Sequence, residues 1–212
     1  MKNIPVFTTA SGVASLTLSN IPYNKTAYIQ IQDSMDPESL LQECRDFCIA
    51  VGAESVMASG HPYLEKHPLY TKVLMLKQSK NKLPASNAVL VKVSEIDSAR
   101  WREIYLERMQ HVPNARYISN ADMRAYVNQE QCFFVRLAEK EIGIGMLRDD
   151  EIVVIAGLLP GMGREILIAL ADRVNAVNVK VTVSDQNKPA IKLYERLGFQ
   201  LENVVSKWYK IS

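Results

Sequence analysis

Cysteine, histidine and long apolar runs are scarce in this sequence of 212 residues, and each shortage excludes a class of protein. There are three cysteines, Cys44, Cys48 and Cys132. This small and odd number argues against a disulfide framework and favours a reducing compartment. Cys44 and Cys48 lie four residues apart on one expected helix face, but no histidine or second cysteine pair stands near them at zinc-site spacing. We therefore interpret them as small buried residues and predict no metal site.

A large charge of one sign is also missing. The formal net charge is only +2, so the composition does not call for nucleic acid or a membrane surface as a partner. The most apolar stretch, IVVIAGLLPGMG, is too short to span a bilayer and is interrupted by glycine and proline. Because the N-terminal stretch MKNIPVFTTASGVASLTLS has no apolar core of secretory type, we expect a cytoplasmic protein.

The composition that is present, 48% hydrophobic and 23% charged residues, is typical of a globular protein. The length allows one large domain or two small ones. The polar stretch KQSKNKLPAS, residues 77–86, contains Pro84 and is interpreted as a linker. We therefore predict an N-terminal segment at residues 1–83 and a second domain at residues 87–212.

The first segment is predicted to alternate strands and helices. Its apolar pattern indicates strands at residues 26–32 and 54–59. Between them, a helix is expected to begin at Asp36, with Pro37 in the first helical position, and to stop at Gly52. Residues 69–76, which follow a His-Pro pair, are expected to form a second helix.

The second segment has a clearer pattern. Strands are expected at residues 87–94, 132–138, 142–147, 151–157, 179–184 and 204–211, and helices at residues 97–110, 120–129, 164–174 and 187–199. Strands joined by tight turns should pair antiparallel, whereas the strand–helix–strand step from residues 151–157 to 179–184 should be parallel. The pattern predicts a mixed α/β fold, with a largely antiparallel sheet flanked by helices.

The two segments are faintly similar to each other. Each runs strand, helix, strand and then a stretch that contains Leu-Tyr, PLYTKVLML in the first and KLYERLGF in the second. Thirty residues separate Leu40 from Tyr70, and 28 separate Ile166 from Tyr194. Either a duplication or a chance similarity explains this pattern.

The run GLLPGMG, residues 157–163, joins a predicted strand to a predicted helix. Free N–H groups at a helix start, with glycines beside them, suit an anion, but a tight strand–helix connection explains the same residues. The run lacks the G-x-x-x-x-G-K-[ST] sequence of nucleoside triphosphate sites. It also lacks the third glycine and downstream acid of a dinucleotide fingerprint.

Two motifs in the second segment resemble those of the GNAT superfamily of acetyl-coenzyme A-dependent N-acetyltransferases. The family's pyrophosphate loop, [QR]-x-x-G-x-[GA], is matched by residues 158–163, with Gly161 and Gly163 in place and Leu158 where Gln or Arg is usual. The second motif, N-x-x-A-x-x-x-Y-x-x-x-G-F, is matched in full by residues 187–199. The resemblance covers about residues 87–212 and implies a GNAT acetyltransferase domain, preceded by a degenerate GNAT-like half.

The resemblance further implies that acetyl-CoA binds where two strands splay apart. Backbone groups of Val153 and Ile155 would hold the pantetheine arm, and loop amides between Pro160 and Arg164 would hold the pyrophosphate. Arg164 itself is equally well explained as a solvated residue of the first helical turn. The cofactor-binding residues implied in this way are Val153, Ile155, Leu158, Pro160, Gly161, Met162, Gly163, Arg164, Asn187 and Ala190.

The family mechanism is direct attack of an amine on the thioester, and Tyr194 matches the tyrosine that acts as acid toward the coenzyme A sulfur. The ordinary pKa of a phenol, near 10, is close to that of the leaving thiol. A core position beside the apolar stripe of its helix is the alternative role for Tyr194. In the family, the helix pair at residues 97–129 would line the acceptor site, with Tyr105, Arg108 and Tyr117 as candidate contacts.

No general base is identifiable from the sequence, because Asp149 and Glu151 are most simply interpreted as solvated turn charges. We predict an N-acetyltransferase that moves an acetyl group from acetyl-CoA to a primary amine of a small molecule or protein, with a homodimer as a candidate assembly. One alternative is a noncatalytic acyl-CoA-binding or regulatory module, which Leu158 and the missing base favour. Another is a scaffold whose first half is an interaction surface.

Overall fold

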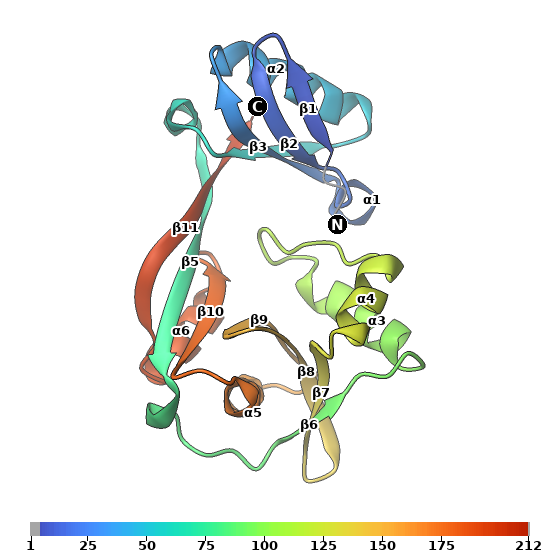
Figure 1. Cartoon of the computed structure of the whole chain (residues 1–212), viewed down its shortest axis with the longest axis vertical. Coiled ribbons are helices and arrows are strands. Elements are labelled where there is room, and N and C mark those ends of the chain that lie inside the picture. Colours follow the sequence, from blue (N-terminus) through green and yellow to red (C-terminus); the bar gives the residue numbers. More distant parts are fainter. Residues whose placement is uncertain (1–4, 212) are drawn as a thin grey trace. The chain divides into compact units, whose positions relative to one another are not determined.

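The computed structural model describes residues 5–211 and forms two compact units (Figure 1). Residues 1–4, the start of the N-terminal stretch that we expect not to be secretory, and residue 212 lie outside the described residues. Unit 1 takes in the chain up to Val73 and again from Val204, and unit 2 runs from Leu74 to Asn203. Strands β5 (Leu69–Ser79) and β11 (Gln200–Ile211) therefore contribute residues to both units.

Unit 1 is a sheet of strand order β1-β2-β3-β4-β11 with one long helix. Strands β3 and β4 run parallel, and the other neighbours in this unit pair antiparallel. Its further elements are β1 (Val6–Thr9), β2 (Gly12–Thr17), α1 (Ile21–Asn24), β3 (Thr26–Ser34), α2 (Pro37–Ala50), β4 (Ser55–Ser59) and the 3₁₀ turn η1 (Pro62–Lys66).

Helix α2 begins and ends as predicted. The Asp36 carboxylate accepts a hydrogen bond from the Ser39 N–H at 3.1 Å, Pro37 needs no N–H partner, and Gly52 follows the helix at φ +100°. Cys44 and Cys48 lie fully buried on the inner face of α2, which confirms their interpretation as core residues. In residues 5–211, no group of three or more possible metal ligands occurs.

The helix predicted for residues 69–76 is wrong, because this stretch is part of strand β5. Thr71 and Val73 are β-branched residues, which favour a strand over a helix. Tertiary pairing adds to this preference, since the backbone N–H of Lys210 donates to the Pro68 carbonyl at 2.9 Å. Tyr70 therefore lies on a strand and Tyr194 on a helix, so these two tyrosines do not occupy equivalent positions.

Unit 2 has the strand order β6-β7-β8-β9-β10-β5. Its pairs from β6 to β9 are antiparallel, and β9–β10 is parallel as predicted. Its further elements are η2 (Lys80–Lys82), β6 (Val89–Lys92), α3 (Ser98–Met109), α4 (Asn120–Asn128), β7 (Cys132–Leu137), β8 (Lys140–Arg148), β9 (Glu151–Gly157), α5 (Gly163–Arg173), β10 (Asn178–Ser184) and α6 (Lys188–Arg196).

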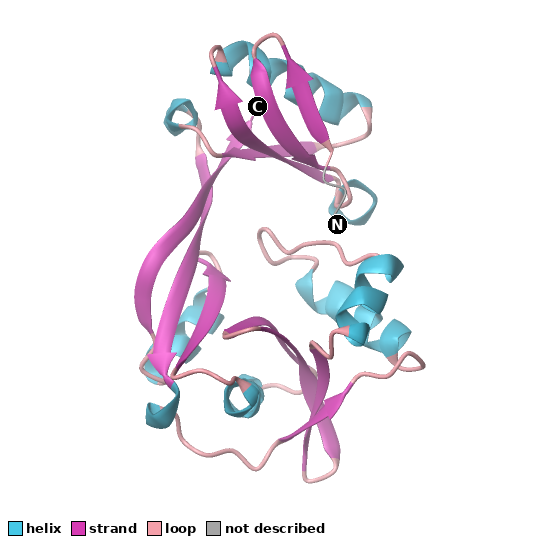
Figure 2. Cartoon of the chain, in the orientation of Figure 1, coloured by secondary structure: helices cyan, strands magenta, loops and turns pink. Residues whose placement is uncertain are grey.

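Helices of unit 2 contribute to two separate cores. One core joins α5 and α6 to the sheet and contains Ile166, Leu170 and Tyr194, while the other joins α3 and α4 to the sheet around Trp101 and Met123. The predicted mixed α/β fold, a largely antiparallel sheet flanked by helices, is confirmed (Figure 2). None of the helices in the described chain is long and apolar enough to cross a membrane.

Candidate coenzyme site

Strands β9 and β10 separate shortly after they meet. Only two residue pairs, Glu151 with Lys180 and Ile152 with Val181, form their parallel ladder. On the other side of β9, residues Ile152 and Val154 pair with consecutive residues of β8, which leaves Val153 as a one-residue bulge. A bulge bends its strand, so Val153 marks the point at which β9 turns away from β10. The predicted splay is thus confirmed.

Beyond Ile152, the β10-facing edge of β9 takes part in no ladder. Val153 and Ile155 are half-buried here, whereas the alternating residues Val154 and Ala156 lie in the core. A strand edge that lacks a neighbour offers backbone N–H and C=O groups to an extended ligand. The splay therefore supplies the kind of edge that an amide-containing arm could pair with.

The loop that follows β9 is open at its glycine. Gly161 has φ +79°, a left-handed conformation that favours glycine, and no atom lies within 4 Å of the place that a Cβ would occupy. Its neighbour Gly163 is more confined, because a Cβ there would lie 3.1 Å from Leu193 Cδ2 of α6. A ligand can thus approach the backbone at Gly161, and the loop lies against α6.

Helix α5 begins at this loop without a side-chain cap. In the part of the chain that the structure describes, the backbone N–H groups of Gly163, Arg164 and Glu165 donate no hydrogen bond. Unpaired N–H groups in a first helical turn, together with the positive end of the helix dipole, form a site for an anion. The backbone N–H of the nearby Leu158 donates a hydrogen bond to the Ile142 carbonyl at 2.8 Å.

The Arg164 side chain is engaged elsewhere. Its guanidinium forms an ion pair with Glu165, whose carboxylate also accepts a hydrogen bond from Ser86 Oγ at 2.7 Å. Pro160 is exposed, and Met162 packs against the α5–α6 core. The candidate phosphate contacts in this structure are therefore backbone amides, and the Arg164 guanidinium is paired with Glu165.

Helix α6 starts and ends with bonds between residues of the second motif. The Asn187 side chain accepts a hydrogen bond from the Ala190 N–H at 3.3 Å, so this pair caps the helix. At the other end, Gly198 has φ +79° and its N–H donates to the Glu195 carbonyl at 2.9 Å. The Phe199 N–H donates to the Tyr194 carbonyl at 3.0 Å, which completes a Schellman motif.

Tyr194 is almost entirely buried, with 7% of its surface exposed. Its ring lies 5.7 Å from that of Phe199, centroid to centroid, so the prediction that Phe199 packs back on this helix is confirmed. Burial raises the pKa of the Tyr194 phenol to about 12. Among residues 5–211, no hydrogen-bond partner engages the Tyr194 hydroxyl.

Glu151, interpreted from the sequence as a solvated turn charge, is instead half-buried and lies at the point of the splay. Thr182 is the first residue of β10 beyond the ladder, and its hydroxyl donates a hydrogen bond to the Glu151 carboxylate. The nearby cation, Lys180, forms an ion pair with Asp150 at 2.9 Å, and this hydrogen bond raises the pKa of Lys180. Within the described chain, Glu151 forms no direct ion pair, but Lys180, its partner in the β9–β10 ladder, interacts with it electrostatically.

The candidate acceptor residues on α3 and its following loop have internal partners. Tyr105 is buried, stacks on Trp101 at 5.7 Å and donates a hydrogen bond to the Arg116 carbonyl at 2.7 Å. The hydroxyl of Tyr117 accepts a hydrogen bond from Arg102 at 2.7 Å. The third candidate, Arg108, is exposed.

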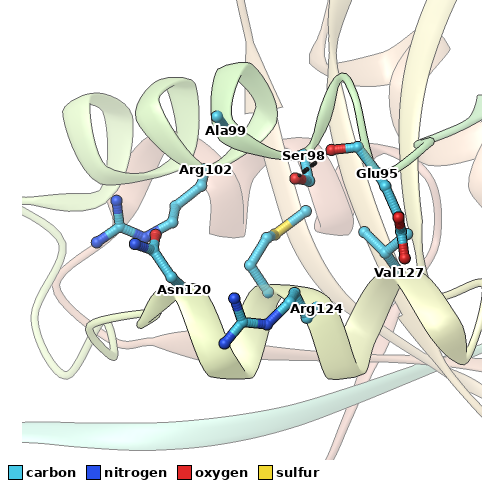
Figure 3. Close-up of a pocket in the computed structure, with 8 residues that line it drawn as sticks. Glu95, Ser98, Ala99, Arg102, Asn120, Arg124 and Val127 are labelled. Carbon is cyan, nitrogen blue, oxygen red and sulfur yellow. Dashed lines mark hydrogen bonds between the residues drawn. The ribbon is translucent and has the colours of Figure 1, made fainter.

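A groove of about 370 Å³ lies between α3 and α4. Figure 3 shows Arg102, Asn120 and Arg124 toward one end and Glu95 toward the other. The positive side chains of this groove therefore lie toward one end and the negative side chain of Glu95 lies toward the other. It is formed by the two helices that the family resemblance assigns to the acceptor side.

No protein-family model and no curated protein sequence matches this chain. Solved structures do match it, and one is a conserved protein of unknown function from Staphylococcus epidermidis, with 13% identity and a TM-score of 0.58. That alignment covers 98% of this chain and 93% of the other.

GCN5-related N-acetyltransferases from Sphaerobacter thermophilus and Kribbella flavida match with TM-scores of 0.54 and 0.61, at 12% and 11% identity. They align with 94% and 96% of this chain, which covers 75% and 58% of their own chains. The chain has the GNAT fold. Identities this low establish the fold of the chain and leave its activity to be argued from the site.

Seen as a GNAT fold, unit 2 brings together most of the predicted site residues. The splay at Val153, the open turn at Gly161 and the helix that bears Tyr194 all belong to this unit. Sequence reasoning missed the link between Glu151 and Thr182, because it depends on the register of β9 against β10. The alternation of VKVTVS placed Thr182 on the face opposite the valines, but nothing in the sequence pairs it with Glu151.

Proposed function

We propose that this protein is an N-acetyltransferase that transfers an acetyl group from acetyl-CoA to a primary amine of a small molecule or protein. The observation that carries this proposal is the splay of β9 from β10 beside a helix start whose amides are unpaired. The names of the matched acetyltransferase structures agree with it. A cytoplasmic location and a homodimer remain predictions.

In this proposal, the backbone holds the coenzyme. The free edge of β9 at Val153 and Ile155 pairs with the amides of the pantetheine arm, and the first amides of α5 bind the pyrophosphate. Gly161 leaves the space through which the phosphate approaches. Because these contacts are backbone groups, they do not require a Gln or Arg side chain at Leu158. The coenzyme contacts assigned here to Pro160, Met162, Asn187 and Ala190 are part of the same proposal.

The reaction begins when the acceptor, which arrives as an ammonium ion, loses a proton to Glu151 directly or through one water. The neutral nitrogen then attacks the thioester carbonyl carbon, and the C–S bond breaks with its electron pair on sulfur. The thiolate takes up one proton, and the new amide releases one to solvent. The sum is ammonium plus acetyl-CoA giving amide, free coenzyme A and one proton. Glu151 suits the first step because Thr182 orients it at the point of the splay.

Tyr194 faces the sulfur in this proposal, but burial changes the role expected for it. With its pKa raised to about 12, the phenol is a weaker acid than a free tyrosine. A thiol has a pKa near 8.5, so complete proton transfer to the thiolate would be uphill by roughly 5 kcal/mol. A hydrogen bond from the Tyr194 hydroxyl to the developing thiolate costs no such transfer and still stabilises the charge.

Calorimetric titration with acetyl-CoA tests the coenzyme part of the proposal, and absence of binding would exclude it. The Tyr194→Phe variant tests the chemistry, with release of free thiol measured against a panel of primary amines. We expect kcat to fall roughly 100-fold while the Kd for acetyl-CoA stays within about twofold. Tyr63→Phe, a matched change in unit 1, should leave both quantities unchanged.

A noncatalytic acyl-CoA-binding or regulatory module is the second candidate function. Two observations favour it: Leu158 replaces the usual polar residue of the loop, and the Tyr194 phenol is a weak acid. This candidate requires acetyl-CoA to bind with the same affinity in wild type and Tyr194→Phe, with no thiol released from any amine of the panel. Turnover that depends on Tyr194 would exclude it.

We also propose that the chain arose by duplication, with unit 1 as a noncatalytic relative of unit 2. Both units contain an antiparallel strand pair with a one-residue bulge, followed by a parallel pair that a helix connects. The functional division into residues 1–83 and 87–212 is part of this proposal.

A further inference from the structure

The end of strand β5 contains polar contacts that the proposed function does not use. The linker prediction is wrong for residues 77–82, which form the end of β5 and the turn η2, and the strand's residues from Leu74 onward belong to unit 2. Leu76 is 5% exposed and lies in the same hydrophobic core as Tyr194. The catalytic unit therefore includes a strand from the first part of the chain.

Gln78 of this strand holds the last turn of α6. Its Nε2 donates a hydrogen bond to the Leu197 carbonyl at 3.0 Å, and its Oε1 accepts one from the Ser79 N–H at 2.8 Å. Both ends of the carboxamide are thus fixed. Leu197 is the C-cap residue of α6, so the bond satisfies one of the carbonyls that a helix terminus leaves unpaired.

Gly198 shows how closely Gln78 approaches this turn. A Cβ on Gly198 would displace Gln78 Nε2, and the φ of +79° at this position itself favours glycine. Glycine suits the left-handed turn and lets the Gln78 amide approach closely. The second motif and β5 are therefore structurally linked.

Lys80, two residues after Gln78, binds the end of helix α5 in a similar way. Lys80 Nζ donates hydrogen bonds to the carbonyls of Asp172 at 2.8 Å and Val174 at 2.7 Å, at the C-terminal end of that helix. A positive side chain at this end is favourable to the helix dipole. The segment from Gln78 to Lys80 thus contacts the ends of the two helices that carry the anion-binding amides and Tyr194.

We propose that Gln78 is a positioning residue, which fixes the C-terminal turn of α6 and thereby the place of the Tyr194 hydroxyl. Tyr194 is three residues before Leu197, and its own carbonyl accepts the Phe199 N–H within the same turn. Loss of the Gln78 bond frees this turn, so the contact between Tyr194 and Phe199 loosens. The inference rests on the proposed function only in assigning Tyr194 to the coenzyme sulfur.

The test uses the full chain labelled with fluorotyrosine, with the Tyr194 resonance assigned from its loss in Tyr194→Phe. Gln78→Glu keeps the shape of the side chain but removes the Nε2 donor, and Gln78→Met removes it without adding charge. We expect both to move the Tyr194 resonance toward that of solvent-exposed tyrosine and to speed hydrogen exchange at residues 197–199 at least tenfold. We also expect kcat to fall about tenfold, with the Kd for acetyl-CoA unchanged.

Gln42→Ala serves as the control, because Gln42 lies on the exposed face of α2 and its side chain bonds to Asp46 of the same helix. An unchanged Tyr194 resonance and unchanged exchange in either folded Gln78 variant would overturn the inference. These two measurements need no activity. If wild type does not bind acetyl-CoA, the proposed function is wrong, but the resonance and exchange measurements still test the structural role of Gln78. If the Gln78 variants shift the Tyr194 resonance while kcat stays unchanged, the inference that Gln78 positions Tyr194 for catalysis is wrong.

Discussion

Unit 1 and unit 2 each place a bulged strand beside a parallel neighbour, but only in unit 2 do both strands continue beyond their shared ladder. In unit 1, β3 and β4 form five residue pairs from Thr26 to Gln30, and β4 ends with the last of them at Ser59. In unit 2, the ladder has two pairs, after which β10 continues to Ser184 and β9 to Gly157. The two units therefore differ in whether both parallel strands continue beyond their ladder, and not in the bulge. We call unit 2, where both strands continue, the open unit, and unit 1 the closed unit.

Glycine positions support this difference. A Cβ on Gly60, just after β4, would collide with the Ile31 carbonyl oxygen, so the chain stays close to β3 where β4 ends. In unit 2, Gly161 of the loop between β9 and α5 has open space around its Cβ position. The same residue type thus permits a close backbone contact in one unit and access for a ligand in the other.

The helix starts differ in the same direction. In unit 1, the Asp36 carboxylate occupies the front of α2, and Pro37 removes one of its N–H groups. In unit 2, α5 has neither a capping side chain nor a proline in its first turn. An anion would be repelled by Asp36 but attracted to the amides of α5. Unit 1 therefore retains the strand–helix–strand framework and lacks the proposed phosphate site.

The largest expected effect comes from removing residues 204–212. Tyr209 and Ile211 of this segment are buried in the core of unit 1, and β11 pairs with β4 there. Losing two buried side chains costs roughly 5 to 10 kcal/mol, which is comparable to the whole stability of a domain. We expect hydrogen-exchange protection of β3 and α2 to disappear. Protection of these elements at the wild-type level would show that unit 1 does not need its last strand.

Making the open helix start resemble the closed one should abolish coenzyme binding. Gly161→Asp places a carboxylate where nothing lies within 4 Å of the Cβ, in a conformation that Asp tolerates better than most residues. Repulsion of several kcal/mol between this charge and a pyrophosphate predicts roughly 1,000-fold weaker acetyl-CoA binding by calorimetry. Gly161→Asn has the same shape without charge and should weaken binding far less. Equal losses in the two variants would mean that the loop is sensitive to size and not to charge.

Removing the charge at the splay should affect acetyl transfer and leave coenzyme binding intact. For Glu151→Gln, we expect kcat/KM for the amine to fall roughly 100-fold, because the proton acceptor is lost. The Kd for acetyl-CoA should not change. Asp150→Asn is the neighbouring control, since Asp150 pairs with Lys180 and has no role in the proposed reaction. If both variants lose activity equally, the effect belongs to the charge of the turn and not to Glu151.

Features that depend on neighbouring residues in the sequence were predictable, and those that depend on tertiary pairing were not. Asp36 with Pro37, and Gly198 with Phe199, fix helix ends through bonds that span a few residues, and both were correctly predicted. Strand β5 was mistaken for a helix, because its partners lie more than one hundred residues away. Gln78 was concealed by a second error, because it belongs to the stretch predicted as a linker, whereas β5 extends to Ser79 and reaches α6.

The smallest expected effect concerns the closed helix start of unit 1. The side-chain and backbone hydrogen bonds of Ser39 lower the pKa of Asp36 below its usual value of 3.8. A group whose pKa is lower in the folded protein stabilises it above the unfolded pKa, and this contribution is lost as the pH falls through the folded pKa. Asp36→Asn keeps an oxygen that can accept the Ser39 N–H but does not titrate. The stability difference between wild type and Asp36→Asn should therefore change only below about pH 4.

Hydrogen exchange of the peptide at residues 36–44, followed from pH 5 to pH 3, measures this difference. A difference that stays constant across that range would mean that the Asp36 carboxylate caps α2 without any preference for its ionised form.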